Sequence, residues 1–138
     1  MVGGVSGQDE GVLAVESVTA DRVVLVASAG DLGVTRRALR LRLRALGLGD
    51  ATVAAVEQAA TELLGAVFER AGFEPVDLMV SCYRLLVSVR VSSRRPVDLG
   101  DEPFGLRERV VSGVAFAWGR RVQADGSVDL WAEVARRR

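Results

Sequence analysis

DATVAAVEQAATELLGAVFERA, residues 50–71, is the most regular stretch of the chain and predicts a long amphipathic helix. Its apolar side chains recur at intervals of three and four residues, which gives a helix one buried face. We expect Asp50 to cap the N-terminus, and Gly72 and Pro75 to end the helix. The apolar face comprises Val53, Val56, Ala60, Leu63, Val67 and Ala71.

The residues before this helix predict a strand followed by a shorter helix. RVVLVAS, residues 22–28, is short and rich in β-branched side chains, as strands are. Residues 1–21 are rich in glycine and in small or acidic side chains, so we expect a loose arm there and a single domain over 22–138. Leucines at helical spacing, ended by two glycines, predict the shorter helix: Leu32, Leu39, Leu43 and Leu46, then Gly47 and Gly49.

The residues after the long helix predict four strands and one more helix. VDLMVSCYRLLVSVRV, residues 76–91, indicates two adjacent strands. RRVQADGSVDLWAEV, residues 120–134, indicates a hairpin, because Asp125-Gly126 favours a tight turn. The third helix is predicted from apolar residues at helical spacing that end at a glycine: Leu106, Val110, Val114 and Trp118, then Gly119.

This order of elements predicts an α/β two-layer sandwich, with a mixed, mostly antiparallel sheet and helices packed on one face. We expect the two tryptophans, Trp118 and Trp131, and the single cysteine, Cys82, to pack in its core. No apolar run approaches the roughly 20 residues that cross a bilayer, so a cytoplasmic protein is expected.

The composition excludes several kinds of active site. The chain has no histidine, lysine, asparagine or isoleucine, and all 18 of its basic residues are arginine. Without histidine there is no Ser-His or Cys-His nucleophile pair and no histidine-bound zinc. Without lysine there is no Walker-type phosphate clamp. Because 18 acidic residues balance the arginines, the charge disfavours non-specific binding to nucleic acid.

Four segments resemble one known family. They are TRRALRLRLRALGL (35–48), EQAATELLGAVFERAG (57–72), SVRVSSRRP (88–96) and FGLRERVVSGVAFAWG (104–119). Together with the element order, they make residues 32–133 similar to the histidine-kinase-like ATPases (GHKL, or Bergerat fold), in particular to the anti-sigma factor serine kinases. The resemblance implies the same two-layer fold.

The resemblance also assigns a nucleotide site, in which most contacts have changed. Glu62 stands at the family's general base, as a relic of that base or as a solvated helix residue. Ala66 stands at the magnesium-binding asparagine, and a methyl group cannot ligate a hard cation. Val91 replaces the aspartate that binds adenine. Pro103 replaces the first glycine of the G-x-G-L motif, whose last two residues are kept as Gly105 and Leu106.

We therefore expect a regulatory protein-binding module that resembles an anti-sigma factor, requires no cofactor and is unable to bind ATP productively. The resemblance implies a sigma factor or an anti-anti-sigma-type protein as partner, and also a homodimer. One side of the first helix carries the predicted partner-binding residues Arg36, Arg37, Arg40 and Arg44.

Two alternatives remain open. The chain is an active ATP-dependent serine/threonine kinase if Glu62 is the base and another oxygen ligand holds magnesium. A nucleic-acid binder that uses the arginine-rich first helix is a third interpretation.

Overall fold

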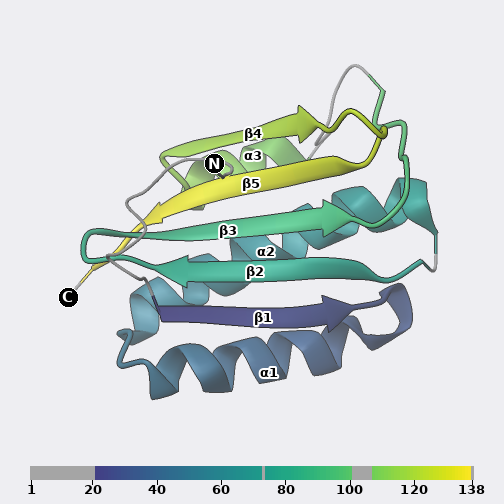
Figure 1. The fold of residues 1–138 in the computed structure, drawn as a ribbon. Helices are drawn as coiled ribbons and strands as arrows, with labels where there is room; N and C mark the ends of the chain where they lie inside the picture. The colour runs from purple at the N-terminus through teal and green to yellow at the C-terminus, as the bar shows by residue number, and fades with distance from the viewer. Residues whose placement is uncertain (1–20, 73, 101–106, 138) are drawn as a thin grey trace.

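The computed structural model describes residues 21–72, 74–100 and 107–137, which form one five-stranded sheet with helices on one face (Figure 1). The predicted order of strands and helices is confirmed, with one short 3-10 helix, η1, added. The elements in chain order are β1 (Asp21–Ala27), η1 (Ala29–Asp31), α1 (Leu32–Ala45), α2 (Asp50–Ala71), β2 (Val76–Cys82), β3 (Leu86–Ser93), α3 (Arg107–Val114), β4 (Ala117–Val122) and β5 (Val128–Ala135).

The sheet has the strand order β1-β2-β3-β5-β4, and each neighbouring pair is antiparallel. The predicted two-layer α/β arrangement is confirmed, although the described sheet is wholly antiparallel and not mixed. The β4–β5 turn follows the predicted hairpin, since Gly126 has a φ of 88°. The Asp125 carboxylate accepts a hydrogen bond from the Ser127 backbone N–H at 2.9 Å and holds the turn closed.

The core lies between the sheet and the helices. Alternate residues of each strand point toward α2, which contacts β2, β3 and β5, while α1 covers β1 and α3 lies beside α2 near β4 (Figure 1). α2 also packs against α1 and α3, so its buried residues contact both the sheet and the neighbouring helices. The largest buried side chains include Leu78, Val80, Val89 and Leu130 from the sheet and Leu39, Leu43, Val56, Leu63 and Val67 from the helices.

The prediction that the third helix runs to Trp118 and Gly119 is wrong. α3 ends at Val114, and Trp118 lies in β4, opposite Ala132 of β5. The spacing from Val114 to Trp118 fits a helix, but pairing with β5, a contact distant in sequence, decides the structure. Trp118 still packs against the core as expected.

Three single-residue predictions have different outcomes. Asp50 is the first residue of α2, and Gly49 takes the capping position without any side-chain hydrogen bond. Trp131 lies between the buried residues Leu130 and Ala132, so it points to the opposite face of the sheet and not into the core. Cys82 is buried as predicted, and this burial raises the pKa of its thiol.

The predicted N-terminal arm lies outside the described residues except for Asp21, which begins β1. Within the described part of the chain, no helix has the length and apolar character that crossing a membrane requires.

Candidate functional site

Two positions that the resemblance assigns to nucleotide binding belong to the apolar core. Ala66 on α2 is 3% exposed, and Val91 on β3 is 0% exposed. Val91 lies between Leu78 of β2 and Leu130 of β5, both of which are buried. A nucleotide needs polar groups at a surface that it can reach. Neither position offers one.

The segment after β3 packs against the C-terminal end of α2. Leu99 is buried in the core, and a Cβ on Gly100 would lie 3.4 Å from Nη2 of Arg70 on α2. The Arg120 guanidinium of β4 donates a hydrogen bond to the Gly100 carbonyl oxygen. This segment therefore lies beside α2, about one helical turn beyond Ala66. The remaining predicted positions Pro103, Gly105 and Leu106 lie outside the described residues.

Glu62, the predicted relic base, lies at a hollow between α1 and α2. The hollow has a volume of about 460 Å³. The sequence interpretation assigned Glu62 to the nucleotide site, and Arg36 and Arg40 to the partner-binding surface. The hollow brings all three residues together. Its lining comprises Arg36, Arg40, Ala54, Glu57, Gln58, Thr61 and Glu62.

Glu57 is the central charged group of this hollow, and the sequence interpretation did not single it out. Its mostly buried carboxylate accepts hydrogen bonds from Arg36 Nε at 3.2 Å and from Arg40 Nε and Nη2 at 3.1 and 2.7 Å. The hydrogen bond from Arg40 is the main reason that the pKa of Glu57 is lowered. Two of the four predicted partner-binding arginines thus join α1 to α2.

We expect Glu57→Gln to destabilise the fold by about 1 to 2 kcal/mol near neutral pH, since the hydrogen bonds to charged groups weaken. Because the folded pKa of Glu57 lies below its ordinary value of 4.5, the contribution is complete above that pH and is lost as the pH falls through the folded pKa. Urea unfolding of wild type and variant from about pH 7 to pH 3 measures it.

Glu74→Gln is the matched control, because Glu74 pairs with Arg95 at 3.0 Å on the exposed surface. Its effect should stay below about 1 kcal/mol. A Glu57→Gln difference that is constant over this pH range would contradict the role assigned to the carboxylate.

The side of α1 that faces away from the core carries exposed apolar residues beside arginines. Successive helical residues are turned by about 100°, so Val34 and Leu41 fall on one line, and they are 57% and 68% exposed. Arg37 and Arg44 follow one side of this line. We call this surface the outer α1 face; it comprises Val34, Arg37, Ala38, Leu41, Arg44 and Ala45.

The four predicted partner-binding arginines therefore divide into two pairs. Arg36 and Arg40 bind Glu57, whereas Arg37 and Arg44 lie on the outer α1 face. Arg44 Nε is 3.8 Å from a carboxylate oxygen of the exposed Asp50, and Arg37 forms no ion pair with a described residue. The sequence interpretation missed the apolar part of the face, although the helical period already separates Leu41 from the buried Leu39 and Leu43.

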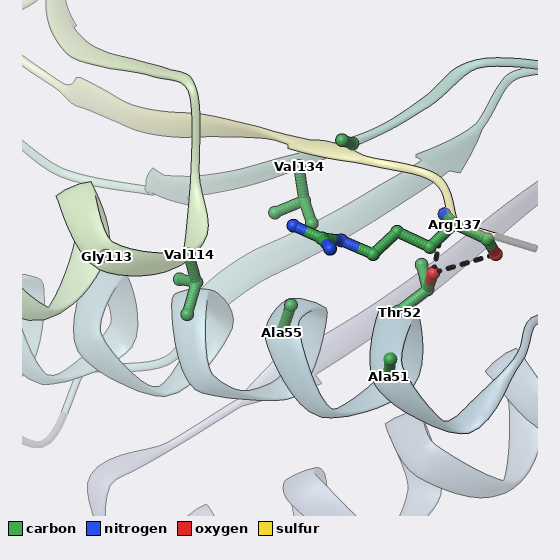
Figure 2. Close-up of a pocket in the computed structure, with 8 residues that line it drawn as sticks. Ala51, Thr52, Ala55, Gly113, Val114, Val134 and Arg137 are labelled. Carbon is green, nitrogen blue, oxygen red and sulfur yellow. Dashed lines mark hydrogen bonds between the residues drawn. The ribbon is translucent and has the colours of Figure 1, made fainter.

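A second hollow, of about 240 Å³, lies where the first turns of α2 meet the ends of α3 and β5 (Figure 2). The Arg137 side chain extends along it toward Val134. Thr52 closes one end, because its hydroxyl accepts a hydrogen bond from the Arg137 N–H at 2.9 Å and donates one to the Arg137 carbonyl at 3.3 Å. Its lining comprises Ala51, Thr52, Ala55, Gly113, Val114, Val134, Ala135 and Arg137.

Thr52→Val should destabilise the fold by about 1 to 3 kcal/mol. The valine fills the same volume in this buried position but leaves the Arg137 backbone N–H without its partner. Thermal unfolding measures the loss, and Thr61→Val is the control, since the Thr61 hydroxyl only donates to the Glu57 carbonyl within α2. Equal losses in the two variants would show that the link from Thr52 to Arg137 adds no stability.

Among the described residues, no three acidic, cysteine or histidine side chains lie close enough together to hold a metal ion. A scan of the chain against protein-family models finds no match, and neither does a search of curated proteins. The resemblance to the anti-sigma kinases therefore stays a prediction.

Proposed function

We propose that this chain is a regulatory protein-binding module of the anti-sigma type, which binds its partner through the outer α1 face. The observation that carries the proposal is the exposure of Leu41 and Val34 in line on a helix, beside Arg37 and Arg44. Large apolar side chains on a helix normally face the core, and a group of them at the surface marks an interaction site.

The chemistry of the outer α1 face selects the kind of partner. Burying an exposed leucine or valine contributes roughly 1.5 to 3 kcal/mol to an interface. α1 contains five arginines and no acidic residue, LGVTRRALRLRLRA. The fitting partner is therefore a protein surface with an apolar strip flanked by carboxylates. The resemblance suggests a sigma factor or an anti-anti-sigma-type protein.

Two positions that the resemblance assigns to nucleotide binding are buried, which supports a mode of action that does not depend on ATP. Ala66 and Val91 contribute apolar atoms to the core, and Leu99 from the following loop is buried with them. A magnesium-bound triphosphate needs oxygen ligands and hydrogen-bond donors, which these side chains do not supply.

The rival interpretation, an active serine/threonine kinase, predicts a different nucleotide titration. For the proposed module, calorimetry with magnesium and ATP should give no heat of binding into the millimolar range. Micromolar binding that Glu62→Ala abolishes would instead support the kinase. Nucleic-acid binding through α1 would show as an affinity that falls steeply with salt.

Affinity capture identifies the partner. Wild-type protein and the variant Leu41→Ser are immobilised side by side and exposed to extract of the native cell. The proposal expects a sigma factor or an anti-anti-sigma-type protein on the wild type that is depleted on the variant. Equal recovery on both surfaces would mean that the outer α1 face is not the binding site.

A further inference from the structure

The face of the sheet that points away from the helices carries a second cluster of chemically active side chains. All three helices lie on the opposite face (Figure 1). Strand alternation therefore brings every second residue of β3, β4 and β5 to this surface, which we call the open sheet face. No described helix or strand covers it.

A hollow of about 190 Å³ lies on the open sheet face over the last three strands of the sheet. Arg90 of β3 is directly opposite Trp131 of β5, and Arg121 of β4 is directly opposite Asp129 of β5. The register of the sheet thus assembles one aromatic ring, two cations, one carboxylate and one hydroxyl. The lining residues are Ser88, Arg90, Arg121, Asp129 and Trp131.

The Trp131 ring is held against the sheet by a glycine. Gly119 lies opposite Trp131 in the β4–β5 pair, and a Cβ at Gly119 would come within 2.8 Å of Trp131 Cζ2 and 3.0 Å of Cε2. The indole therefore rests over the Gly119 backbone, where any larger residue would displace it. Such a supported ring is a platform on which a second flat ring can stack.

The charges of the hollow do not cancel. Neither Arg90 nor Arg121 forms an ion pair with a described residue. The Asp129 carboxylate accepts a hydrogen bond from the Gln123 side-chain amide at 2.8 Å. Among the lining residues, two guanidinium groups beside one carboxylate leave an excess of one positive charge, and Glu133, opposite Ser88 in the β3–β5 pair, lies outside the lining. A ligand with a single negative charge neutralises this excess.

We propose that this hollow binds a planar aromatic monoanion, namely an aryl carboxylate that carries a hydroxyl or amino substituent. The ring stacks on Trp131, and the carboxylate lies between Arg90 and Arg121, whose planar guanidinium groups match a carboxylate geometrically. The substituent donates a hydrogen bond to Asp129. This inference does not depend on the proposed partner surface on α1, which lies on the other side of the molecule.

Size and charge separate this ligand from a nucleotide. Pockets for drug-sized ligands have volumes of about 300 to 1,000 Å³, so a hollow of about 190 Å³ takes one substituted ring. A phosphate dianion beside Asp129 would also meet like-charge repulsion, which weakens its binding.

Titration with 4-aminobenzoate and 4-hydroxybenzoate, followed by tryptophan fluorescence, tests the proposal. We expect saturable quenching with a Kd of about 1 mM or tighter, as the size of a one-ring ligand allows. Cyclohexanecarboxylate lacks the stacking ring and benzamide lacks the charge, so each should bind at least tenfold more weakly. Equal binding of either control, or no saturation, would overturn the proposal.

Four variants locate the site. Arg90→Gln and Arg121→Gln should each weaken binding at least tenfold without changing thermal unfolding, since both arginines are exposed. Arg84→Gln, in the exposed β2–β3 turn, removes the same charge elsewhere and should change nothing. Trp131→Phe should abolish the quenching, because Trp118, the other of the 2 tryptophans, faces the helices. Binding that survives both Arg90→Gln and Arg121→Gln, or a mononucleotide that binds more tightly than the aryl carboxylates, would contradict the assignment.

Discussion

Val91→Asp, which introduces the residue that the resemblance to the anti-sigma kinases expects at this position, is expected to unfold the domain at neutral pH. The side chain is completely buried between Leu78 and Leu130. An ionised carboxylate without a partner in such a place costs several kcal/mol. A domain of this size is stable by only about 5 to 15 kcal/mol. Circular dichroism and the dispersion of amide resonances measure the loss of structure.

The matched control for this prediction is Val24→Asp. Val24 lies in β1 on the open sheet face and is exposed, so a carboxylate there remains hydrated and should cost less than about 1 kcal/mol. If Val91→Asp instead folds and binds magnesium-ATP, then position 91 faces a nucleotide cleft. That result would contradict the placement of Val91 in the core and weaken the proposed mode of action.

Leu41→Ser is expected to weaken binding of the captured partner by about 10- to 100-fold. Burying a leucine side chain contributes roughly 1.5 to 3 kcal/mol, and each 1.4 kcal/mol is about tenfold in affinity. Because Leu41 is already exposed in the free protein, the free energy of unfolding should change by less than about 0.5 kcal/mol. Calorimetric titration of the partner and urea unfolding measure the two quantities.

Leu85→Ser tests whether the effect is specific to the outer α1 face. Leu85 is as exposed as Leu41 but lies in the turn between β2 and β3, so its substitution should leave the affinity unchanged. Arg44→Gln should weaken binding chiefly at low salt, since an exposed charge attracts its partner across solvent. Equal losses from Leu41→Ser and Leu85→Ser would mean that exposed apolar area in general drives the binding.

Most of the elements were predictable because their signals are local. The apolar face of α2, the alternation along β3 and the Asp125-Gly126 turn each depend on residues within a few positions of one another. The boundary between α3 and β4 was not predictable in this way. Val114 and Trp118 fit one helical period, yet Trp118 lies in β4, where it pairs with Ala132 of β5.

The candidate sites were predictable only in part. The arginines of α1 are evident in the sequence, but their division into two pairs depends on Glu57, which lies 17 positions from Arg40 and 21 from Arg36. Similarly, nothing local brings Arg90 beside Trp131, since β3 and β5 are separated by α3 and β4. Nothing in the sequence distinguishes Glu57 except its position at the edge of the apolar face of α2.

The sequence by itself determined the order of the elements, the two-layer arrangement and the classes of catalysis that a chain without histidine or lysine cannot perform. Those conclusions depend on periodicity and on side-chain chemistry, which are properties of single segments. Only the tertiary structure decided that Val91 is core, that Glu57 holds two of the four arginines, and that Trp131 faces outward. The physical reason is that strand register and helix packing bring together groups that no local pattern connects.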